Sequence, residues 1–155
     1  MSAAIEYSTN QASEAEIAEH LLRCDSDFML PLSARVEIKD YAQKIVSNAA
    51  RFEAWSGDTL VGLAAAYCND MESGVAFVTS VSVLREWAGK GIMSKLISQC
   101  IEHAKKFGMW RISLEVGDGN MPAIRLYEKY GFVAGKVNLP FITMHLNLEN
   151  EGTHE

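Results

Sequence analysis

Hydrophobic residues recur at helical spacing in two segments of the chain, and each pattern predicts an amphipathic helix. Over residues 38–49 the apolar face consists of Ile38, Tyr41, Ala42, Ile45, Val46 and Ala49. Over residues 92–107 it consists of Ile92, Leu96, Ile97, Cys100, Ile101 and Ala104, and Gly108 is a suitable C-terminal cap. A third helix is expected from Ser13 to about Leu22, because Ser13 and Glu16 have capping-box spacing.

Alternation over residues 75–83 predicts a half-buried strand with two different faces. One face carries Val75, Phe77, Thr79, Val81 and Val83, and the other carries Ala76, Val78, Ser80 and Ser82. Further strands are expected at residues 5–7, 51–55, 59–68, 111–116 and 141–148, with a turn at 56–58 that makes a hairpin. Asn120 is expected to cap a short helix that has Pro122 in its first turn and ends at Gly131.

These elements predict an α/β fold with a mixed sheet, whose first strands are joined by hairpins and later ones by helical crossovers. We expect a single domain over residues 1–149 and a frayed tail over 150–155. With 48% hydrophobic and 22% charged residues, the composition is that of a soluble globular protein. No apolar run approaches the roughly 18 residues that a membrane span needs, so a membrane partner is not expected.

The charge distribution narrows the class of ligand. A net charge of −6 argues against general nucleic-acid binding, which requires a basic face. Residues 85–111 nevertheless hold six basic side chains against two acidic ones, which suits a small polyanionic ligand, although Lys105 and Lys106 are better explained as a solvated helix face.

Cysteine usage bears on compartment and metal binding. The three cysteines are irregularly spaced, which predicts reduced thiols in a cytoplasmic protein and neither a disulfide framework nor a zinc site. The N-terminus shows no basic or apolar segment of an export signal. His20 and Cys24 are four residues apart, but two such residues do not make a metal site.

Residues 83–94 run from the predicted strand into the predicted helix through a turn that contains Gly89 and Gly91. A helix N-terminus leaves backbone N–H groups without partners and carries about half a positive charge from the helix dipole, so it favours phosphate. The two glycines would allow a diphosphate to approach the backbone closely. The dinucleotide-binding pattern G-x-G-x-x-G after an early strand and the P-loop pattern are both absent.

A second pattern follows at residues 120–132, Asn-Met-Pro-Ala-Ile-Arg-Leu-Tyr-Glu-Lys-Tyr-Gly-Phe. Together with the strand that ends Val81-Ser-Val83, the turn Gly89-Lys-Gly91-Ile92 and the strand segment Leu114-Glu-Val116, it resembles the GNAT superfamily of acetyl-CoA-dependent N-acetyltransferases. The resemblance covers roughly residues 59–133. The chain departs from the family pattern at Ala88, where Arg or Gln is usual, and at Met93, where Gly or Ala is usual.

The resemblance implies a GNAT-like mixed sheet of six or seven strands flanked by about four helices. It implies transfer of an acetyl group from acetyl-CoA to a primary amine by direct attack, with no metal. Acetyl-CoA would lie between the diverging strands at residues 75–83 and 111–116. Contacts to it would come from Ala88, Gly89, Lys90, Gly91, Ile92, Met93 and Ser94 at the diphosphate, and from Asn120 and the backbone of Val81, Ser82 and Val83 at the pantetheine arm and thioester.

Two residues are candidates for catalysis. By the resemblance, Tyr127 would hydrogen-bond the departing sulfur; the structural alternative is a core tyrosine packed with Ala123 and Tyr130. Glu115 could act as general base, directly or through water, because an amine with a pKa near 10 is almost wholly protonated at about pH 7.5. The structural alternative is a glutamate on the polar side of a strand.

The acceptor stays open among small amines, amino sugars, amino acids and peptide N-termini. Residues 24–37, 69–73 and 134–141 are expected to line its pocket, where the acidic loop residues Asp25 and Asp27 would favour a cationic amine. Two other functions compete: a non-catalytic acyl-CoA-binding regulatory module on the same fold, and a domain that acts through protein contacts alone. A homodimer is possible, because the fold commonly forms one.

Overall fold

The computed structural model describes residues 4–25 and 31–148. Within them, seven strands form one mixed sheet in the order β1-β2-β3-β4-β5-β7-β6. The strands are β1 (Glu6–Thr9), β2 (Ala50–Ser56), β3 (Thr59–Tyr67), β4 (Val75–Val83), β5 (Arg111–Gly117), β6 (Val133–Asn138) and β7 (Phe141–Asn147). The helices are α1 (Glu14–Cys24), α2 (Ile38–Asn48), α3 (Ile92–Lys106) and α4 (Met121–Lys129), with short 3-10 helices η2 (Leu32–Ala34) and η3 (Arg85–Trp87). The expected mixed α/β fold is confirmed.

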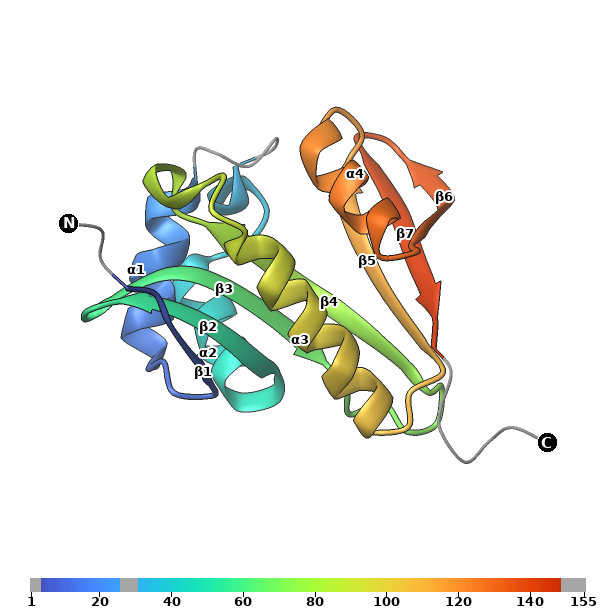
Figure 1. The fold of residues 1–155 in the computed structure, drawn as a ribbon, viewed down its shortest axis with the longest axis horizontal. Helices are drawn as coiled ribbons and strands as arrows, with labels where there is room; N and C mark the ends of the chain where they lie inside the picture. The colour runs from blue at the N-terminus through green and yellow to red at the C-terminus, as the bar shows by residue number, and fades with distance from the viewer. Residues whose placement is uncertain (1–3, 26–30, 149–155) are drawn as a thin grey trace.

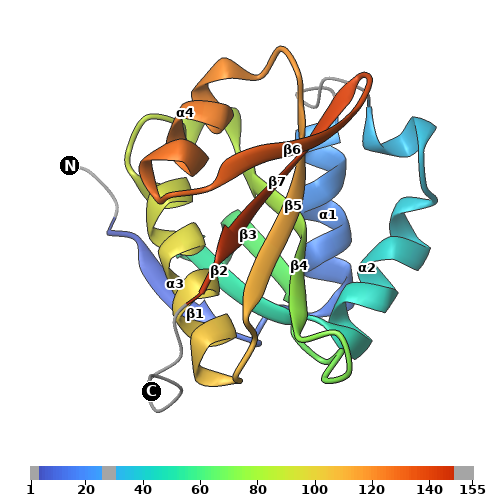
Figure 2. The ribbon, with the colours of Figure 1, turned by 90° about the vertical axis from the view of Figure 1, so that its right-hand side faces the viewer.

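The helices cover the sheet unequally (Figure 1). Strands β1 to β4 carry α1 and α2 on one face and α3 on the other, as the turned view shows (Figure 2). Two hydrophobic clusters correspond to these faces: one joins α1 and α2 to the sheet, and a larger one joins α3 and α4 to it. No helix in the described part of the chain is both long and apolar enough to span a membrane.

The local signals that predicted the helices are present in the structure. Ser13 Oγ accepts from Glu16 N at 3.1 Å, and Glu16 Oε1 accepts from Ser13 N at 2.9 Å, which completes the capping box of α1. Asn120 Oδ1 accepts from Ala123 N at 3.3 Å at the start of α4. Gly108 follows the end of α3 with φ +77°, the left-handed conformation that glycine adopts without strain.

Gly62 in β3 sets how closely α3 approaches the sheet. A Cβ atom at this position would lie 2.8 Å from Ile92 Cγ2 and 3.2 Å from Leu96 Cδ1. Because real side chains do not approach that closely, only glycine lets the first turns of α3 lie directly on β3. The N-terminus of α3 is thereby held against the central strands.

A β-bulge at Thr79 divides β4 into two halves. Ser80 pairs with Ala65 and Val78 pairs with Ala66, so Thr79 is an extra residue in β4. Such a bulge bends its strand and increases the local twist. The parallel ladder between β4 and β5 ends at the same place, since its last pair is Val78 with Leu114.

Burial alternates along residues 75–83 as predicted, but the bulge reverses which side chains face which side of the sheet, so the prediction of two continuous faces is wrong. Ala76 and Val78 belong to the α3 cluster, and beyond the bulge Val81 and Val83 pack against that same cluster. Ser82 instead bonds His20 of α1 on the opposite face. The residues that the alternation placed on one face therefore lie on both faces, with the change at Thr79.

Strand β6 was not among the strands expected from the pattern. All six of its residues are exposed, and it pairs only with β7, at the edge of the sheet. With no buried face, it has no alternation of hydrophobic and polar positions to reveal it. Other element ends differ from expectation by up to two residues, as at α1, which continues to Cys24.

Candidate active site

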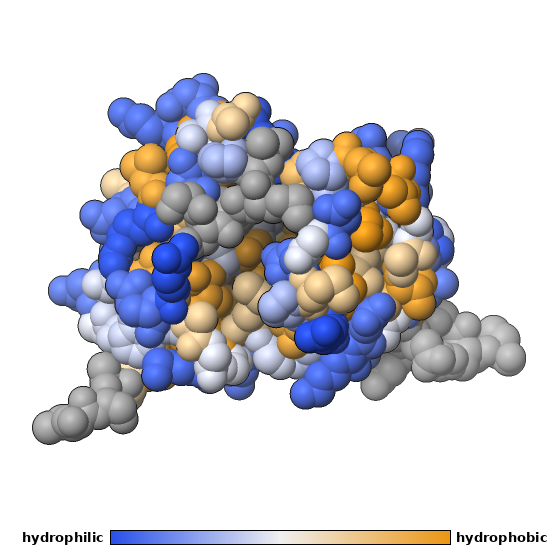
Figure 3. Space-filling model, turned by 90° about the horizontal axis from the view of Figure 1, so that it is seen from above, coloured by the Kyte–Doolittle hydropathy of each residue, from blue (hydrophilic) through white to orange (hydrophobic). Residues whose placement is uncertain are grey.

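A slot opens between β4 and β5 beyond the end of their shared ladder. β5 stays paired with β7 along its whole length, from Arg111 to Gly117, while β4 follows β3 away from it. The cavity between them has a volume of about 150 Å³ and is lined by residues 78–81 of β4, residues 114–117 of β5, and Leu32, Arg35, Tyr41, Asn120, Tyr127 and Phe141. Seen from the end at which the strands part, the surface is hollowed, and hydrophobic residues are visible inside the hollow (Figure 3).

The predicted turn at the start of α3 exposes backbone donors. Gly89 and Gly91 both have φ +79°, and a Cβ at either position would meet open space. The first helical hydrogen bond runs from Lys95 N to Gly91 O at 3.1 Å, so the N–H groups of residues 92–94 have no partner within the helix. Among the described residues, no side chain caps this end. The turn is therefore a chemically suitable anion site, and glycine is required by the backbone conformation.

One expected donor in this turn is already occupied. Ala88 N donates to Arg85 O at 3.1 Å, which closes η3. Ala88, which was expected to contact the diphosphate, therefore has no free backbone N–H to donate to it. Residues 89–91 are exposed, and their backbone N–H groups extend the set of donors at residues 92–94 instead.

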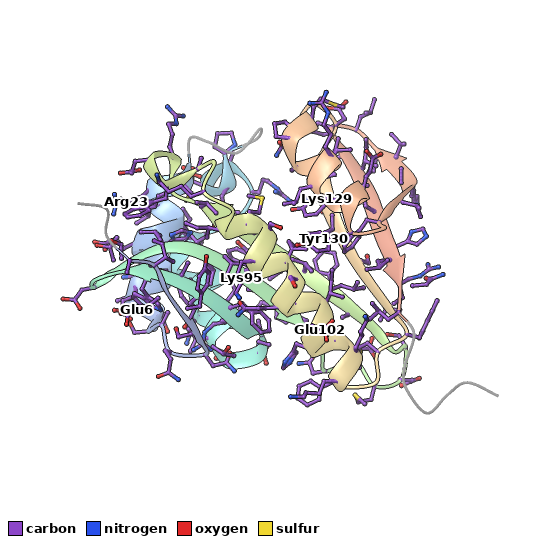
Figure 4. All side chains as sticks on the ribbon, in the orientation of Figure 1. Glu6, Arg23, Lys95, Glu102, Lys129 and Tyr130 are labelled. Atoms are coloured by element: carbon purple, nitrogen blue, oxygen red, sulfur yellow. The ribbon has the colours of Figure 1, made fainter. Side chains whose placement is uncertain are left out.

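Ser94, in the first turn of α3, contacts Tyr130 at the C-terminal end of α4. Its hydroxyl lies 2.6 Å from the Tyr130 hydroxyl, and Tyr130 also donates to Ser94 O at 3.1 Å. Figure 4 shows Tyr130, at the C-terminal end of α4, directed toward α3. Because its side chain already contacts Tyr130, Ser94 can serve an anion most simply through its backbone N–H.

The backbone of β4 presents alternate residues to the slot. Leu84 N donates to Val61 O at 2.8 Å, and hydrogen-bonded pairs alternate along an antiparallel ladder. Ser82 is therefore bonded to β3, whereas the N–H and C=O groups of Val81 and Val83 point away from β3, toward the slot. Of the three β4 residues expected to contact acetyl-CoA, Val81 and Val83 can do so through backbone groups, and Ser82 is turned to β3.

Ser82 also has its side chain engaged on the far face. His20 Nδ1 donates to Leu60 O at 2.8 Å, so His20 Nε2 is unprotonated and accepts from Ser82 Oγ at 2.9 Å. Burial is the main cause that lowers the pKa of His20, which favours this neutral form. Cys24 Sγ lies 3.7 Å from His20 Nε2.

In the described ranges, no three His, Cys, Asp or Glu side chains cluster in a way that could hold a metal ion.

Tyr127 lies inside the slot on α4. It is buried, with its ring centroid 5.7 Å from that of Phe132, and burial raises its pKa. A buried phenol keeps its proton through the neutral range and can donate a hydrogen bond to a developing anion. Tyr127 is therefore packed in the core, as a structural role requires, and it also lines the slot, as a catalytic role requires.

Glu115 faces the slot from β5, opposite a residue that the sequence patterns did not single out. Arg35, just after η2, places Nη2 4.0 Å from Glu115 Oε1, and its guanidinium lies 4.5 Å from the centre of the Phe141 ring. Arg35 and Glu115 are eighty positions apart in the chain, and a lone arginine in a loop carries no local signal. Only the fold brings them together.

The expected acceptor segments fall in different places. Leu32, Arg35 and Phe141 line the slot, as expected for parts of residues 24–37 and 134–141. The turn at 69–73 lies at the closed end of β4, where Trp110 Nε1 donates to Ser73 O at 2.8 Å, so its assignment to the pocket is wrong. Asp27, Phe28 and Met29 and the tail at 150–155 lie outside the described residues.

The comparisons agree with this geometry. The model of the acetyltransferase (GNAT) family matches residues 15–132. The uncharacterized N-acetyltransferase YsnE of Bacillus subtilis is 39% identical over 85 residues, which cover 52% of this chain and 54% of that protein. The spermine/spermidine N(1)-acetyltransferase of the same species is 31% identical over 77 residues, covering 49% and 51%. The chain thus spans about half the length of these curated relatives.

A solved structure shows that the likeness extends to the whole fold. YncA from Salmonella typhimurium, solved with its cofactor acetyl-CoA, superposes with a TM-score of 0.72 at 17% identity, covering 95% of this chain and 96% of that one. With the family match over most of its length, this chain belongs to the GNAT family of acetyltransferases.

Proposed function

We propose that the protein is an N-acetyltransferase that moves an acetyl group from acetyl-CoA to a primary amine. The observation that carries the proposal is the slot between β4 and β5, with the open N-terminus of α3 nearby and Tyr127 within it. Family membership and the acetyl-CoA bound by YncA support the choice of co-substrate. The relative named for spermine and spermidine supports an amine as acceptor.

The residues present fit coenzyme A in two parts. The diphosphate would be held by backbone N–H groups from Gly89, Lys90 and Gly91 through Ile92, Met93 and Ser94, where the helix dipole favours negative charge. The pantetheine arm would pair with the outward backbone groups of Val81 and Val83 as an added strand does. Asn120, whose Oδ1 caps α4, keeps its amide nitrogen for a further contact.

When bound, acetyl-CoA supplies the acetyl group as a thioester, whose C–S bond breaks as the new N–C bond forms. The protein's part is to accept and donate protons and to stabilise charge. Glu115 accepts the proton of the incoming ammonium, directly or through water. The Val81 N–H points into the slot and can donate to the carbonyl oxygen as it gains charge. Tyr127 donates a hydrogen bond to the departing sulfur.

The cysteines also bear on where the reaction would occur. Cys68 and Cys100 are free thiols, and burial raises the pKa of each. Buried, protonated thiols suit a reducing compartment, and we propose the cytoplasm.

The test is release of free thiol from acetyl-CoA in the presence of a panel of primary amines. An acetyltransferase releases thiol only when an acceptor is added, and the acetylated amine appears in equal amount by mass spectrometry. Binding of acetyl-CoA without turnover on any amine would favour the non-catalytic module instead. The departures from the family pattern at Ala88 and Met93 make that alternative the main competitor.

A further inference from the structure

The charged side chains of the slot form one opposed pair. Among the described residues that line it, Arg35 is the single cation and Glu115 the single anion. They approach to 4.0 Å from opposite walls, with 39% and 41% of their side chains exposed. Ion pairs this exposed and this long are weak, so a ligand that offers better partners can separate them.

Arg35 is held in the wall by its neighbours. Its guanidinium stacks over Phe141, at 4.5 Å from the ring centre. The preceding turn is anchored by Asp25, which accepts from Ser33 N at 2.8 Å and from Ser33 Oγ at 2.7 Å. These hydrogen bonds lower the pKa of Asp25, so the anchor stays ionised at neutral pH. The positive charge of the Arg35 guanidinium is therefore held in place in the wall of the slot.

An acceptor amine must deliver its proton toward Glu115, if Glu115 is the base. Any second group a few ångströms from that amine then meets Arg35. A carboxylate there would gain two charge-assisted hydrogen bonds from the guanidinium, while a second ammonium would face a like charge. The slot therefore favours a ligand with one amine and one carboxylate, and it disfavours a polyamine.

We propose that the acceptor is an amino-carboxylate, of the amino-acid class, and that Arg35 selects it by binding the carboxylate. This inference rests on the proposed acetyltransferase function. Leu32, Tyr41 and Phe141, which also line the slot, would contact the side chain of such an acceptor.

The experiment compares each amino acid with its own amide, which keeps the amine and the side chain and replaces the charged carboxylate with a neutral amide. Thiol release is measured for each pair, with spermidine as the polyamine. The carboxylate form should have a kcat/KM at least about tenfold above its amide. Arg35→Gln should raise KM for the carboxylate form by about 10- to 100-fold, a much larger change than for the amide, and Arg35→Lys should restore part of the difference.

Arg111 provides a matched control variant. It also stacks on an aromatic ring, with its guanidinium 4.6 Å from the centre of the Trp110 ring, but it lies at the closed end of β5. Arg111→Gln should keep the preference for the carboxylate form. Thermal melts of both variants establish that they are folded.

If amides are acetylated as efficiently as the acids, or if spermidine is preferred over every amino acid, the inference is overturned. The acetyltransferase function would remain supported in either case. Turnover of no amine at all also overturns it. In that case stabilisation by acetyl-CoA alone shows whether the cofactor site survives, which separates failure of the acceptor inference from failure of the proposed function.

Discussion

Tyr41 of α2 donates its hydroxyl hydrogen to the carbonyl oxygen of Thr79, at 2.6 Å, at the bulge where β4 leaves β5. The same hydroxyl lies 2.7 Å from Thr79 Oγ1. A bulge leaves one residue of its strand unpaired in the ladder, and its polar groups need another partner. Tyr41 supplies that partner from the helix packed on the sheet, so α2 helps to keep the slot open.

Tyr41→Phe should therefore lower both stability and cofactor binding. Losing the partner of a half-buried carbonyl costs about 1–3 kcal/mol, measurable as a lower free energy of unfolding in urea. The KM for acetyl-CoA should rise as the bulge relaxes. Tyr7→Phe is the control, because Tyr7 is exposed and its strand β1 is separated from β4 by β2 and β3. Equal stability of the two variants would refute the role given to Tyr41.

Substitutions at Gly91 and Gly108 test whether the proposed diphosphate site is the turn at the N-terminus of α3. They flank its two ends with φ +79° and +77°, and a Cβ atom added at either would have no other atom within 4 Å. Alanine at either should cost roughly 1–2 kcal/mol of backbone strain. Only Gly91→Ala should also weaken acetyl-CoA binding, by calorimetric titration, because only it redirects N–H groups at the N-terminus. A similar loss of affinity in both variants would place the diphosphate elsewhere.

Tyr127→Phe tests the hydrogen bond from Tyr127 to the departing sulfur. We expect kcat to fall by about 10- to 1000-fold with little change in acetyl-CoA affinity, because the phenyl ring keeps the packing and only the donor is lost. Since burial raises the pKa of Tyr127, no loss of kcat from its ionisation is expected below about pH 10. Tyr7→Phe on the distant strand β1 is the control. An unchanged kcat would remove Tyr127 from the mechanism.

His20 should make stability depend on pH. Burial lowers its pKa, so the unfolded chain binds a proton that the folded protein excludes. The unfolded chain holds more protons between the folded-state pKa and about 6.5, so the free energy of unfolding rises with pH across this window. Above about pH 6.5, neutral His20 makes its full contribution to the free energy of unfolding. On acidification below that pH, this contribution is lost at up to about 1.4 kcal/mol per pH unit.

The measurement compares urea unfolding at about pH 5.5 and 7.5 for the wild type and His20→Gln. The variant should show a smaller pH dependence, since glutamine does not titrate. Burial also lowers the pKa of His103, with a further contribution from Lys106, so His103→Gln measures that second histidine separately. If the free energy of unfolding of His20→Gln depends on pH as steeply as that of the wild type, buried neutral His20 is not the cause of the pH dependence.

Much of the fold could be predicted because its signals are local. The stripe of α3, the glycines at its ends, and the caps at Ser13 and Asn120 each depend on a few neighbouring residues, and each was found where it was expected. Strand β6 could not be found in this way, because a fully exposed edge strand carries no hydrophobic alternation.

The candidate site could be predicted only in part, because its geometry depends on contacts between distant residues. The bulge at Thr79 follows from the register with β3 and the contact with Tyr41, and neither is visible in the alternation of β4. The occupied N–H of Ala88 and the engagement of Ser82 with His20 likewise follow from tertiary structure. The pairing of Arg35 with Glu115 crosses the slot and required the fold to be known.

The most direct test of the account is a thermal melt with and without acetyl-CoA, with dephospho-coenzyme A as a comparison ligand. At about 100 times Kd, a ligand that binds only the folded state adds roughly 2.7 kcal/mol of stability. For a chain of this size the predicted result is a rise in Tm of roughly 5–10 °C. An unchanged Tm at millimolar acetyl-CoA would contradict the account, because the turn at Gly89–Gly91 and the slot beside it would then bind no coenzyme A.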